Sequence, residues 1–360
     1  MTQRVGIVGA GVNGVCAAIV LAEAGHQVTL IDRGIPFAET SSKSSKLLHG
    51  GIRYLEQFRL GLVREALIER AWWLKEAPQF TRVSRFYIPI DQYSPRSRWM
   101  LYAGAKLYEV LAGQRGLGPS RYHSARETLE HNPELSPQGL RASVSYVDVQ
   151  MDEPGLSAWL LDRAMEAGVR LESQTAVDQV RTDGRLSLAS GDEWSFDWIV
   201  NAAGPWSAGL LAKSGIQSAY KISLIRGSHL RFSRPLTHPL VVQSRVDDRI
   251  VFLLPEPGGL LCGTTEVEQR EGEPIQCHAD EERYLLNAVK GVLSVELTAS
   301  MIVDRFAGVR PIAFKGHALG DFSSASRDSE IEVNRRLITI FGGKWTSAMH
   351  LGERIARRVQ

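Results

Sequence analysis

The first 32 residues of the chain alternate between short apolar runs and a glycine-rich turn. Apolar positions at 5, 7 and 8 predict a buried strand, and positions 15–24, where Ala and Leu dominate, are compatible with a helix. Gly25 ends that helix, and the apolar run 28–31 predicts a second buried strand. A strand, a helix and a strand in this order are typical of the start of a doubly wound α/β sheet.

The rest of the chain mixes helical periodicity with strand-like runs. We expect helices over 60–75, 96–112, 152–168 and 278–293, and a last helix after Thr346. Strands are predicted over 170–180, 186–189, 198–200, 302–312 and 337–341, and β-rich runs joined by turn residues fill 221–265. The pattern predicts an α/β protein with a Rossmann-like nucleotide-binding part and a substrate part built on an antiparallel or mixed sheet.

The turn after the first strand carries the sequence Gly-x-Gly-x-x-Gly. Gly9 permits a tight turn, Gly11 lets the backbone approach a pyrophosphate, and Gly14 lets the helix pack closely on the strand. The free N–H groups at the helix start favour an anion, and Asp32, at the end of the second strand, suits a ribose hydroxyl. The segment predicts a bound dinucleotide, either FAD or NAD.

Composition narrows the class of protein. In 360 residues, 44% are hydrophobic and 23% are charged, which is typical of a globular protein. The net charge of +2 is too small to indicate a nucleic-acid partner. The three cysteines lack the spacing of a disulfide framework or a metal site, so we expect reduced thiols, no metal and a cytoplasmic location. No apolar run approaches the length of a spanning helix.

Three further segments lie where ligands bind in doubly wound proteins. The Ser- and Lys-rich segment 39–56 follows the second strand, and NAAGPW at 201–206 follows the strand predicted at 198–200. FGGKWT at 341–346 follows the last predicted strand. Because ligands bind at the carboxyl ends of the strands in such sheets, we expect these segments to meet around one site.

These motifs together resemble the FAD-dependent glycerol-3-phosphate dehydrogenases, within the D-amino-acid-oxidase-like flavoproteins. The most specific match is TSSKSSKLLHGGIRYLE at 40–56, and NAAGPW, IRGSHL at 225–230, AGVRP at 307–311 and FGGKWT follow in family order. The resemblance implies bound FAD and oxidation of sn-glycerol 3-phosphate to dihydroxyacetone phosphate. It also implies an FAD-binding domain over 1–80, 145–215 and 335–360, and a substrate domain over 81–144 and 216–334.

The chain departs from that family in two places. It ends shortly after the helix that follows Lys344, where members usually continue into a helical domain, and Glu256 replaces the usual aromatic residue after Leu254 and Pro255. We therefore leave the electron acceptor open among quinone, oxygen and a soluble carrier. We expect at most weak peripheral contact with the inner face of the membrane.

The expected cofactor-binding residues come from the glycine turn, the Ser-rich loop and the family motifs. Hydroxyls, backbone N–H groups and a lysine in the Ser-rich loop suit a pyrophosphate and a ribityl chain. The full set is Gly9, Gly11, Asn13, Gly14, Asp32, Ser41, Ser42, Ser45, Lys46, Leu47, His49, Gly50, Gly204, Trp206, Gly343, Lys344, Trp345 and Thr346. Thr346 is equally compatible with a helix N-cap, and Trp72 and Trp73 are assigned to core packing.

Oxidising an anionic secondary alcohol requires cations for the anion and a base for the hydroxyl proton. Guanidinium and ammonium groups suit phosphate or carboxylate oxygens, and the resemblance implies substrate contacts from Arg53, Tyr54, Arg310, Arg327 and Lys344. Imidazole titrates near neutral pH, so His229 and His49 are the candidate bases. We favour His229 as the base and expect His49 to pack near the flavin.

Two alternatives remain at this stage. A 2-hydroxy-acid or amino-acid oxidase would use Arg310 to hold a carboxylate, and a flavin-binding regulatory protein would have no turnover. Mixing the protein with substrates of each class, without oxygen, and following reduction of the flavin separates the three hypotheses.

Overall fold

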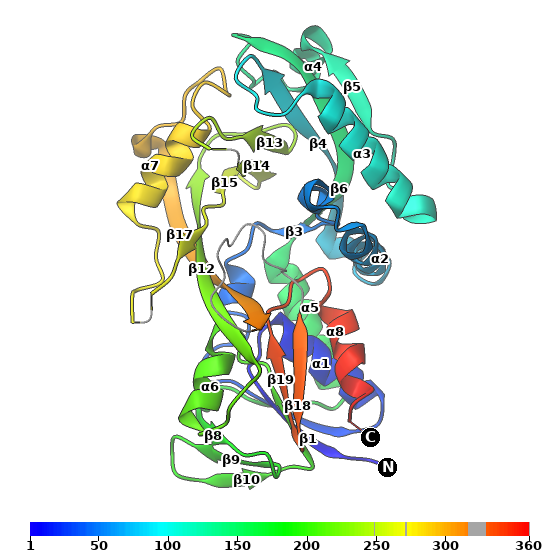
Figure 1. Ribbon diagram of the computed structural model, residues 1–360, viewed down its shortest axis with the longest axis vertical. Coiled ribbons are helices and arrows are strands. Elements are labelled where there is room, and N and C mark those ends of the chain that lie inside the picture. The colour runs from blue at the N-terminus through cyan, green and yellow to red at the C-terminus, as the bar shows by residue number, and fades with distance from the viewer. Residues whose placement is uncertain (248, 271, 316–328, 360) are drawn as a thin grey trace.

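The structure, a computed structural model, describes residues 1–247, 249–270, 272–315 and 329–359. Two β-sheets dominate the chain and lie one above the other in Figure 1. The smaller sheet is at the bottom of that view, beside both chain ends, and the larger sheet curves through the top. Two long strands, β12 (Tyr220–Phe232) and β17 (Ile302–Lys315), extend from the top part toward the bottom part.

The smaller sheet has six strands in the order β18-β19-β11-β1-β2-β7. All neighbours are parallel except β18 and β19, which pair antiparallel. The strands are β1 (Arg4–Val8), β2 (Gln27–Ile31), β7 (Arg170–Glu172), β11 (Trp198–Asn201), β18 (Glu330–Asn334) and β19 (Leu337–Phe341). The parallel strands require crossover connections, which the helices provide.

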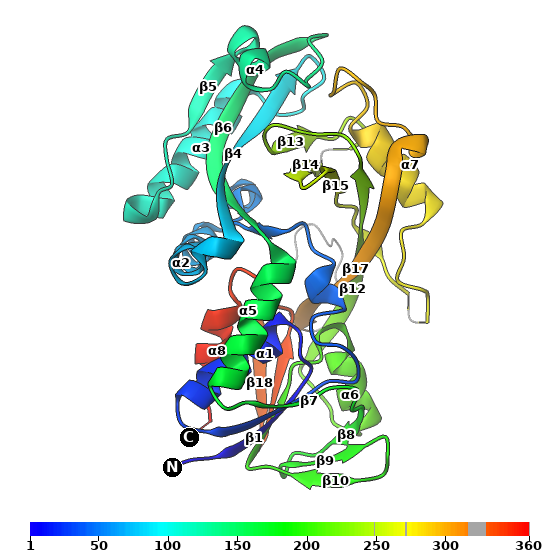
Figure 2. The same cartoon turned by 180° about the vertical axis from the view of Figure 1, so that it is seen from behind.

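Helices cover one face of this sheet, and a mixed layer covers the other. The helices α1 (Val12–Glu23), α5 (Glu153–Glu166) and α8 (Ala348–Ala356) lie together in front of the sheet in Figure 2. The opposite layer holds α6 (Ser207–Lys213) and a small sheet of β8 (Val177–Val180), β9 (Arg185–Leu188) and β10 (Glu193–Ser195). Along β19, Ile338 and Ile340 pack with the helices, whereas Leu337 and Phe341 pack on the opposite face.

The larger sheet has ten strands and carries most of the remaining chain. Its order is β16-β12-β15-β14-β13-β4-β6-β3, with β17 on β12 and β5 on β6, and its β13–β4 pair is parallel. Besides β12 and β17, the strands are β3 (Leu47–Leu48), β4 (Thr81–Asp91), β5 (Arg121–Ser124), β6 (Leu140–Met151), β13 (Leu240–Gln243), β14 (Ile250–Glu256), β15 (Gly259–Gly263) and β16 (Val267–Glu268).

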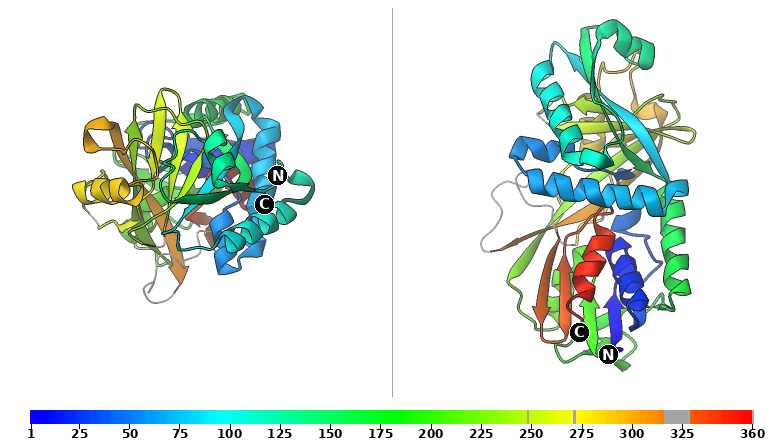
Figure 3. Two further views of the ribbon diagram at one scale, coloured as in Figure 1. Left: turned by 90° about the horizontal axis from the view of Figure 1, so that it is seen from above. Right: turned by 90° about the vertical axis from the view of Figure 1, so that its right-hand side faces the viewer.

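Four helices pack around the larger sheet. Figure 3, right, shows α2 running across the molecule between the two sheets. The helices are α2 (Leu60–Glu76), α3 (Arg98–Ala112), α4 (Ala125–His131) and α7 (Ala279–Ala288). Among the described residues, no helix is both long and apolar enough to cross a bilayer.

The structure confirms the expected α/β class with its mixed second sheet, and most predicted elements. The helix predicted over 278–293 ends earlier, at Ala288, and the strand predicted over 170–180 is split into β7 and β8. The predicted set lacked β4 and β6, although these strands pair with each other along most of their length. Their hydrophobic alternation is weak because β6 buries polar residues such as Ser143, Ser145 and Asp148.

The boundaries expected between the two domains cross the observed sheets. The strand β18 belongs to the smaller sheet, although residues up to 334 were assigned to the substrate domain. The strand β6 belongs wholly to the larger sheet, although residues from 145 onward were assigned to the FAD-binding domain. The division into two domains therefore stays a prediction. Its expected boundaries do not coincide with the borders of the two sheets.

Candidate active site

A cavity of about 570 Å³ lies between the two sheets. This volume is within the range of roughly 300–1,000 Å³ that is typical of small-molecule and cofactor sites. Its walls come from the carboxyl ends of β1 and β2, from the segment 37–54, and from β6, β14 and β17 of the larger sheet. The carboxyl-end location agrees with the position expected for the ligand in a doubly wound sheet.

The glycine turn forms one end of the cavity with the geometry that its spacing predicted. Gly9 has φ of +105°, and a Cβ there would lie 2.5 Å from the Ala202 carbonyl oxygen. A Cβ on Gly14 would lie 1.8 Å from the Gly9 carbonyl oxygen, so α1 approaches the turn as closely as glycine allows. Gly11 lines the cavity, and α1 begins directly after it. The helix start therefore faces the cavity with its partial positive charge.

Asp32 lies at the cavity wall and also fixes the turn. Its carboxylate accepts hydrogen bonds from the backbone N–H of Ala10 at 2.6 Å and of Gly34 at 2.8 Å. The hydroxyl of Ser41 accepts a hydrogen bond from the Val12 N–H at 3.0 Å, the first N–H of α1. The turn, the acid and the Ser-rich segment thus meet at one end of the cavity.

The Ser-rich segment is held against the C-terminal motif. The Trp345 indole N–H donates to the Ser41 carbonyl at 2.8 Å, and the Trp73 indole N–H donates to the Thr346 carbonyl at 2.9 Å. Asn13 donates through Nδ2 to the Gly342 carbonyl at 3.1 Å. The helix α8 has Ser347 as its N-cap residue, so Thr346 lies one residue before the cap and faces the cavity.

Cationic side chains gather where the larger sheet and the segment 37–54 line the cavity. Arg53, Arg249 and Arg310 line it together with Glu266, and the Lys344 ammonium lies 4.7 Å from the centre of the Tyr54 ring. Guanidinium nitrogens of the three arginines lie 3.3 to 4.0 Å from the Glu266 carboxylate oxygens. These three guanidinium groups can supply several hydrogen bonds to the oxygens of an anionic ligand.

Arg310 is oriented by the end of a neighbouring strand. Its Nη2 donates to the Thr264 hydroxyl at 2.8 Å, and its Nη1 donates to the Thr265 carbonyl at 3.4 Å. The side chain is partly exposed to the cavity at 29%. These two contacts set the direction of the planar guanidinium group.

Comparison with known proteins identifies the family. The sequence profile described as "FAD dependent oxidoreductase" matches residues 4–358 of the chain. The chain belongs to the FAD-dependent oxidoreductase family. Its cofactor is FAD, and the match over nearly the whole length of this oxidoreductase covers both sheets.

Similar curated proteins are glycerol-3-phosphate dehydrogenases. This oxidoreductase is 29% identical to the aerobic glycerol-3-phosphate dehydrogenase of Staphylococcus aureus strain MRSA252 over 97% of its own chain and 65% of that protein. It is 31% identical to the mitochondrial glycerol-3-phosphate dehydrogenase SDP6 of Arabidopsis thaliana, over 96% of its chain and 59% of that protein. The chain thus spans about three fifths of the length of these relatives.

Solved structures of several enzymes share the fold. The glycerol-3-phosphate dehydrogenase of Bacillus halodurans, complexed with FAD, has a TM-score of 0.77 at 22% identity, over 99% of this chain and 64% of that one. The L-alpha-glycerophosphate oxidase of Mycoplasma pneumoniae has a TM-score of 0.77 at 20% identity, over 100% and 94%. The glycine oxidase of Geobacillus kaustophilus has 0.74 at 21%, over 99% and 95%. These likenesses show the fold alone.

The residues of the cavity fit FAD. A Cβ on Gly11 would lie 3.2 Å from the Ser41 hydroxyl oxygen, so the glycine keeps that space open for a ligand. The start of α1 provides N–H groups for a pyrophosphate. The Asn13 Oδ1 atom is buried without a hydrogen-bond partner among the described residues. The Arg33 guanidinium lies 4.0 Å over the Trp206 ring, which forms a flat wall near Asp32.

The structure brings most of the predicted cofactor residues to the cavity. Those that line it are Gly9, Gly11, Asn13, Asp32, Ser41, Ser45, Leu47, His49, Gly204, Trp206, Gly343, Lys344, Trp345 and Thr346. Gly14, Ser42, Lys46 and Gly50 do not line it. Lys46 instead donates to the Glu153 carboxylate at 2.5 Å and to the Ser42 carbonyl at 2.6 Å, because burial makes an ion pair the stable arrangement for its ammonium group.

The two candidate bases have different positions. His49 lines the cavity, whereas His229 is 1% exposed and does not line it. His229 Nε2 lies 2.9 Å from the Ser45 hydroxyl, which does line the cavity. Burial, followed by the charges of Arg310, Lys46 and Arg231, lowers the pKa of His229 well below its usual value. The geometry therefore favours His49 over His229 as the group that reaches a substrate in the cavity, and the assignment of the base stays a prediction.

The backbone beside His49 is fixed by a buried polar chain. The N–H of Gly50 donates to the Tyr108 hydroxyl at 2.8 Å, and that hydroxyl donates to the Asp148 carboxylate at 2.7 Å. Arg70 Nη1 donates to the other carboxylate oxygen at 3.0 Å. Burial and the neighbouring Asp148 raise the pKa of Tyr108 well above its usual value. The hydroxyl stays protonated and keeps the His49 segment in place.

Two residues that line the cavity, Arg249 and Glu266, were not predicted from the sequence. Arg249 precedes β14, and Glu266 follows β15 in the run Gly263 to Glu266. Both lie at strand ends of the predicted β-rich region, and a charged residue at such a position was the only sequence feature that could have indicated a site residue. Arg327, the remaining predicted substrate contact, lies outside the described residues.

Proposed function

We propose that this oxidoreductase oxidises sn-glycerol 3-phosphate to dihydroxyacetone phosphate. The observation that carries the proposal is the convergence of Arg53, Arg249 and Arg310 around Glu266 in the wall of the cavity that the glycine turn also lines. An anion held by the arginines places the rest of a small substrate inside the cavity. The similarity to glycerol-3-phosphate dehydrogenases supports a phosphate as that anion.

The protein's task in this reaction is to bind, orient and deprotonate the substrate. FAD, when bound, supplies the acceptor for the hydride that leaves the alcohol carbon. Arg310, fixed by Thr264, and Arg53 would hold the phosphate oxygens, so that the reacting carbon is positioned rather than free to rotate. Ile250 and Phe252 also line the cavity, and their apolar side chains would exclude water from that part of its wall.

His49 is the residue we assign to accept the hydroxyl proton. It lies in the cavity wall, close in sequence to Arg53, and an imidazole titrates near neutral pH. Removing the hydroxyl proton makes the carbon a better hydride donor, so the base must reach the hydroxyl group on the same carbon whose C–H bond faces the hydride acceptor. His229 acts behind this wall by fixing the Ser45 hydroxyl.

Anaerobic flavin reduction tests the proposal. The purified holoenzyme is mixed without oxygen with sn-glycerol 3-phosphate, its enantiomer, L-lactate and glycine, and flavin absorbance near roughly 450 nm is followed. Fast bleaching by sn-glycerol 3-phosphate alone supports the proposal. Faster bleaching by lactate or glycine identifies a hydroxy-acid or amino-acid oxidase, and bleaching by none of them favours a protein without turnover.

A further inference from the structure

Glu266 is an acidic side chain in the part of the cavity where cations gather. Its Oε1 lies 3.5 Å from Arg53 Nη2 and 4.0 Å from Arg310 Nη1, and its Oε2 lies 3.3 Å from Arg249 Nη2. The side chain is 10% exposed, and all four residues line the cavity. A carboxylate among three guanidinium groups has the same contacts that a substrate anion would make.

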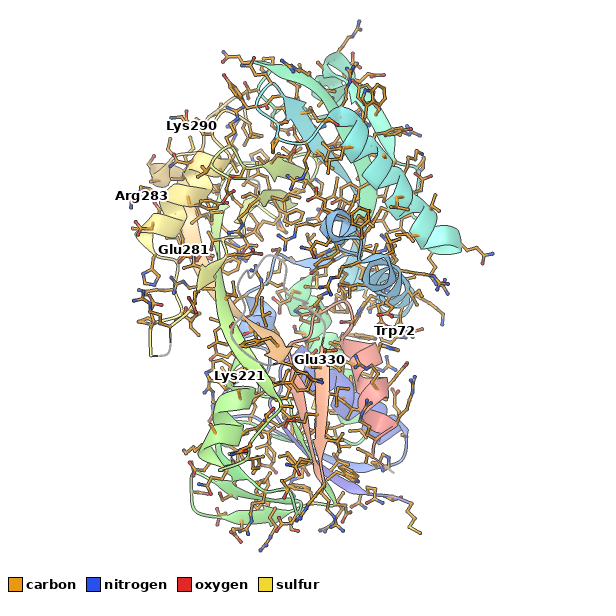
Figure 4. All side chains as sticks on the ribbon, in the orientation of Figure 1. Trp72, Lys221, Glu281, Arg283, Lys290 and Glu330 are labelled. Carbon is orange, nitrogen blue, oxygen red and sulfur yellow. The ribbon has the colours of Figure 1, made fainter. Side chains whose placement is uncertain are left out.

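The position of Glu266 is fixed by the strands around it. It comes directly before β16, which pairs with β12, and two residues after Thr264, which orients Arg310. The adjacent Thr265 is buried, and its hydroxyl donates to Glu281 at 2.6 Å. Glu281, labelled on α7 in Figure 4, also accepts from Arg226 at 2.8 Å. The carboxylate is thus carried by an anchored segment, beside the arginines.

We propose that Glu266 is an internal competitor for the substrate anion, which weakens anion binding to the arginines and so speeds release of an anionic product. The inference rests on the proposed function, because it concerns the anionic group of the substrate. Two effects act together. An incoming anion must replace carboxylate contacts of the guanidinium groups, and it is repelled by the negative charge of Glu266 itself.

The second effect depends on the charge of the ligand. Repulsion by a fixed negative charge is twice as large for a dianion as for a monoanion at the same place. Removing the charge of Glu266 should therefore strengthen the binding of a dianion by more than that of a monoanion. A purely structural role, in which Glu266 only holds the arginines in place, predicts the opposite sign, because loosened arginines bind every anion less well.

The test measures the dissociation constants of sulfate and methanesulfonate on the holoenzyme by calorimetry, at constant ionic strength. Both probes are tetrahedral sulfur oxyanions, and they differ in charge. In Glu266→Gln we expect sulfate to bind at least about tenfold more tightly and methanesulfonate to gain roughly the square root of that factor. With sn-glycerol 3-phosphate, KM and kcat should both fall, because the product also leaves more slowly.

A matched control is Glu268→Gln, which removes an exposed carboxylate two residues away that does not line the cavity. It should leave both dissociation constants within about twofold of wild type. If Glu266→Gln loses FAD, Glu266→Ala replaces it in the same measurement. Unchanged or weaker sulfate binding in the variant overturns the inference, and so does an equal gain for the two anions.

These measurements do not depend on turnover. A wild-type protein that binds sulfate but does not oxidise sn-glycerol 3-phosphate would overturn the proposed function. The dissociation constants of sulfate and methanesulfonate would still test the role of Glu266. A wild-type protein that oxidises sn-glycerol 3-phosphate, with no tighter sulfate binding in Glu266→Gln, would overturn the inference alone.

Discussion

The imidazole of His229 and the hydroxyl of Ser45 are in contact through Nε2 and Oγ at 2.9 Å, and Ser45 lies between that imidazole and the cavity. His229 also stacks on Phe306, with ring centres 4.9 Å apart, and its ring fills the space left by Gly263. The imidazole is thus held on several sides. Ser45, and not His229 itself, lines the cavity at this point.

This arrangement predicts different effects for the two histidines. His49→Gln should lower kcat by about 10²- to 10⁴-fold, because it removes the proposed base. His229→Gln should lower kcat by about tenfold or less, since it disturbs only the position of Ser45. Stopped-flow reduction of the flavin in both variants, with FAD content as a control, measures the difference.

The pH profile gives an independent check on this assignment. Because the pKa of His229 is lowered well below its usual value, His229 is neutral throughout the neutral range. An acid limb of kcat/KM that lies near the usual pKa of histidine must then come from another group. That limb should persist in His229→Gln and disappear in His49→Gln. The opposite result would restore His229 as the base.

Substitutions of Arg310 test the anion site. Arg310→Ala should cost roughly 2 to 5 kcal/mol, or about 30- to 5000-fold in kcat/KM, because a charge-assisted pair with the substrate anion is lost. Arg310→Lys keeps the charge but loses the forked geometry, so it should lie between wild type and Ala. FAD content should not change. An Arg310→Ala enzyme within about threefold of wild type would show that the anchor lies elsewhere.

Two glycine-to-alanine substitutions in helices should change stability in opposite directions, one through steric overlap and the other through helix propensity. In Gly14→Ala the new Cβ would lie 1.8 Å from a backbone oxygen of Gly9, so we expect a loss of about 3 kcal/mol or more and loss of FAD. Gly61, in the first turn of α2, has no atom within 4 Å of a new Cβ. Gly61→Ala should therefore stabilise the protein by about 0.5 kcal/mol. Thermal unfolding and flavin absorbance test both.

Glu69 should make stability depend on pH. This carboxyl lies 3.6 Å from His350 at the contact of α2 and α8, and burial, followed by repulsion from Glu353, raises its pKa to about 7. Its folded pKa exceeds the unfolded value of 4.5, so its protonated form is favoured in the fold and stability is lost as pH rises from 4.5 to 7.

The variant Glu69→Gln removes this dependence. It should be more stable than wild type by about 1 to 3 kcal/mol at pH 8 and equally stable near pH 4.5. Glu166→Gln, at an exposed position of α5, serves as the control and should change the melting temperature little at either pH. A Glu69→Gln gain that does not change between the two pH values would contradict the assignment.

The sequence alone determined the features that depend on local spacing. The turn at Gly9, Gly11 and Gly14 requires small residues at fixed intervals, and the adjoining apolar runs have the periods of strands and a helix, so the nucleotide-binding unit followed from residues close in the chain. The motif segments were expected at one site because the carboxyl ends of parallel strands share one edge of a sheet. Arg53 and Arg310 were selected by motif resemblance, and the structure places both at the cavity.

The tertiary structure alone decided which polar side chains face the cavity. Glu266 lies far from Arg53 in the chain and meets it because β16 pairs with β12 beside the segment 40–56. His229 follows the same rule: β15 and β17 flank it on β12, and their packing turns it behind Ser45 and removes it from water. Residue type gives a side chain its chemistry, but burial and the facing charges come from strands distant in sequence, so only the folded chain fixes the role.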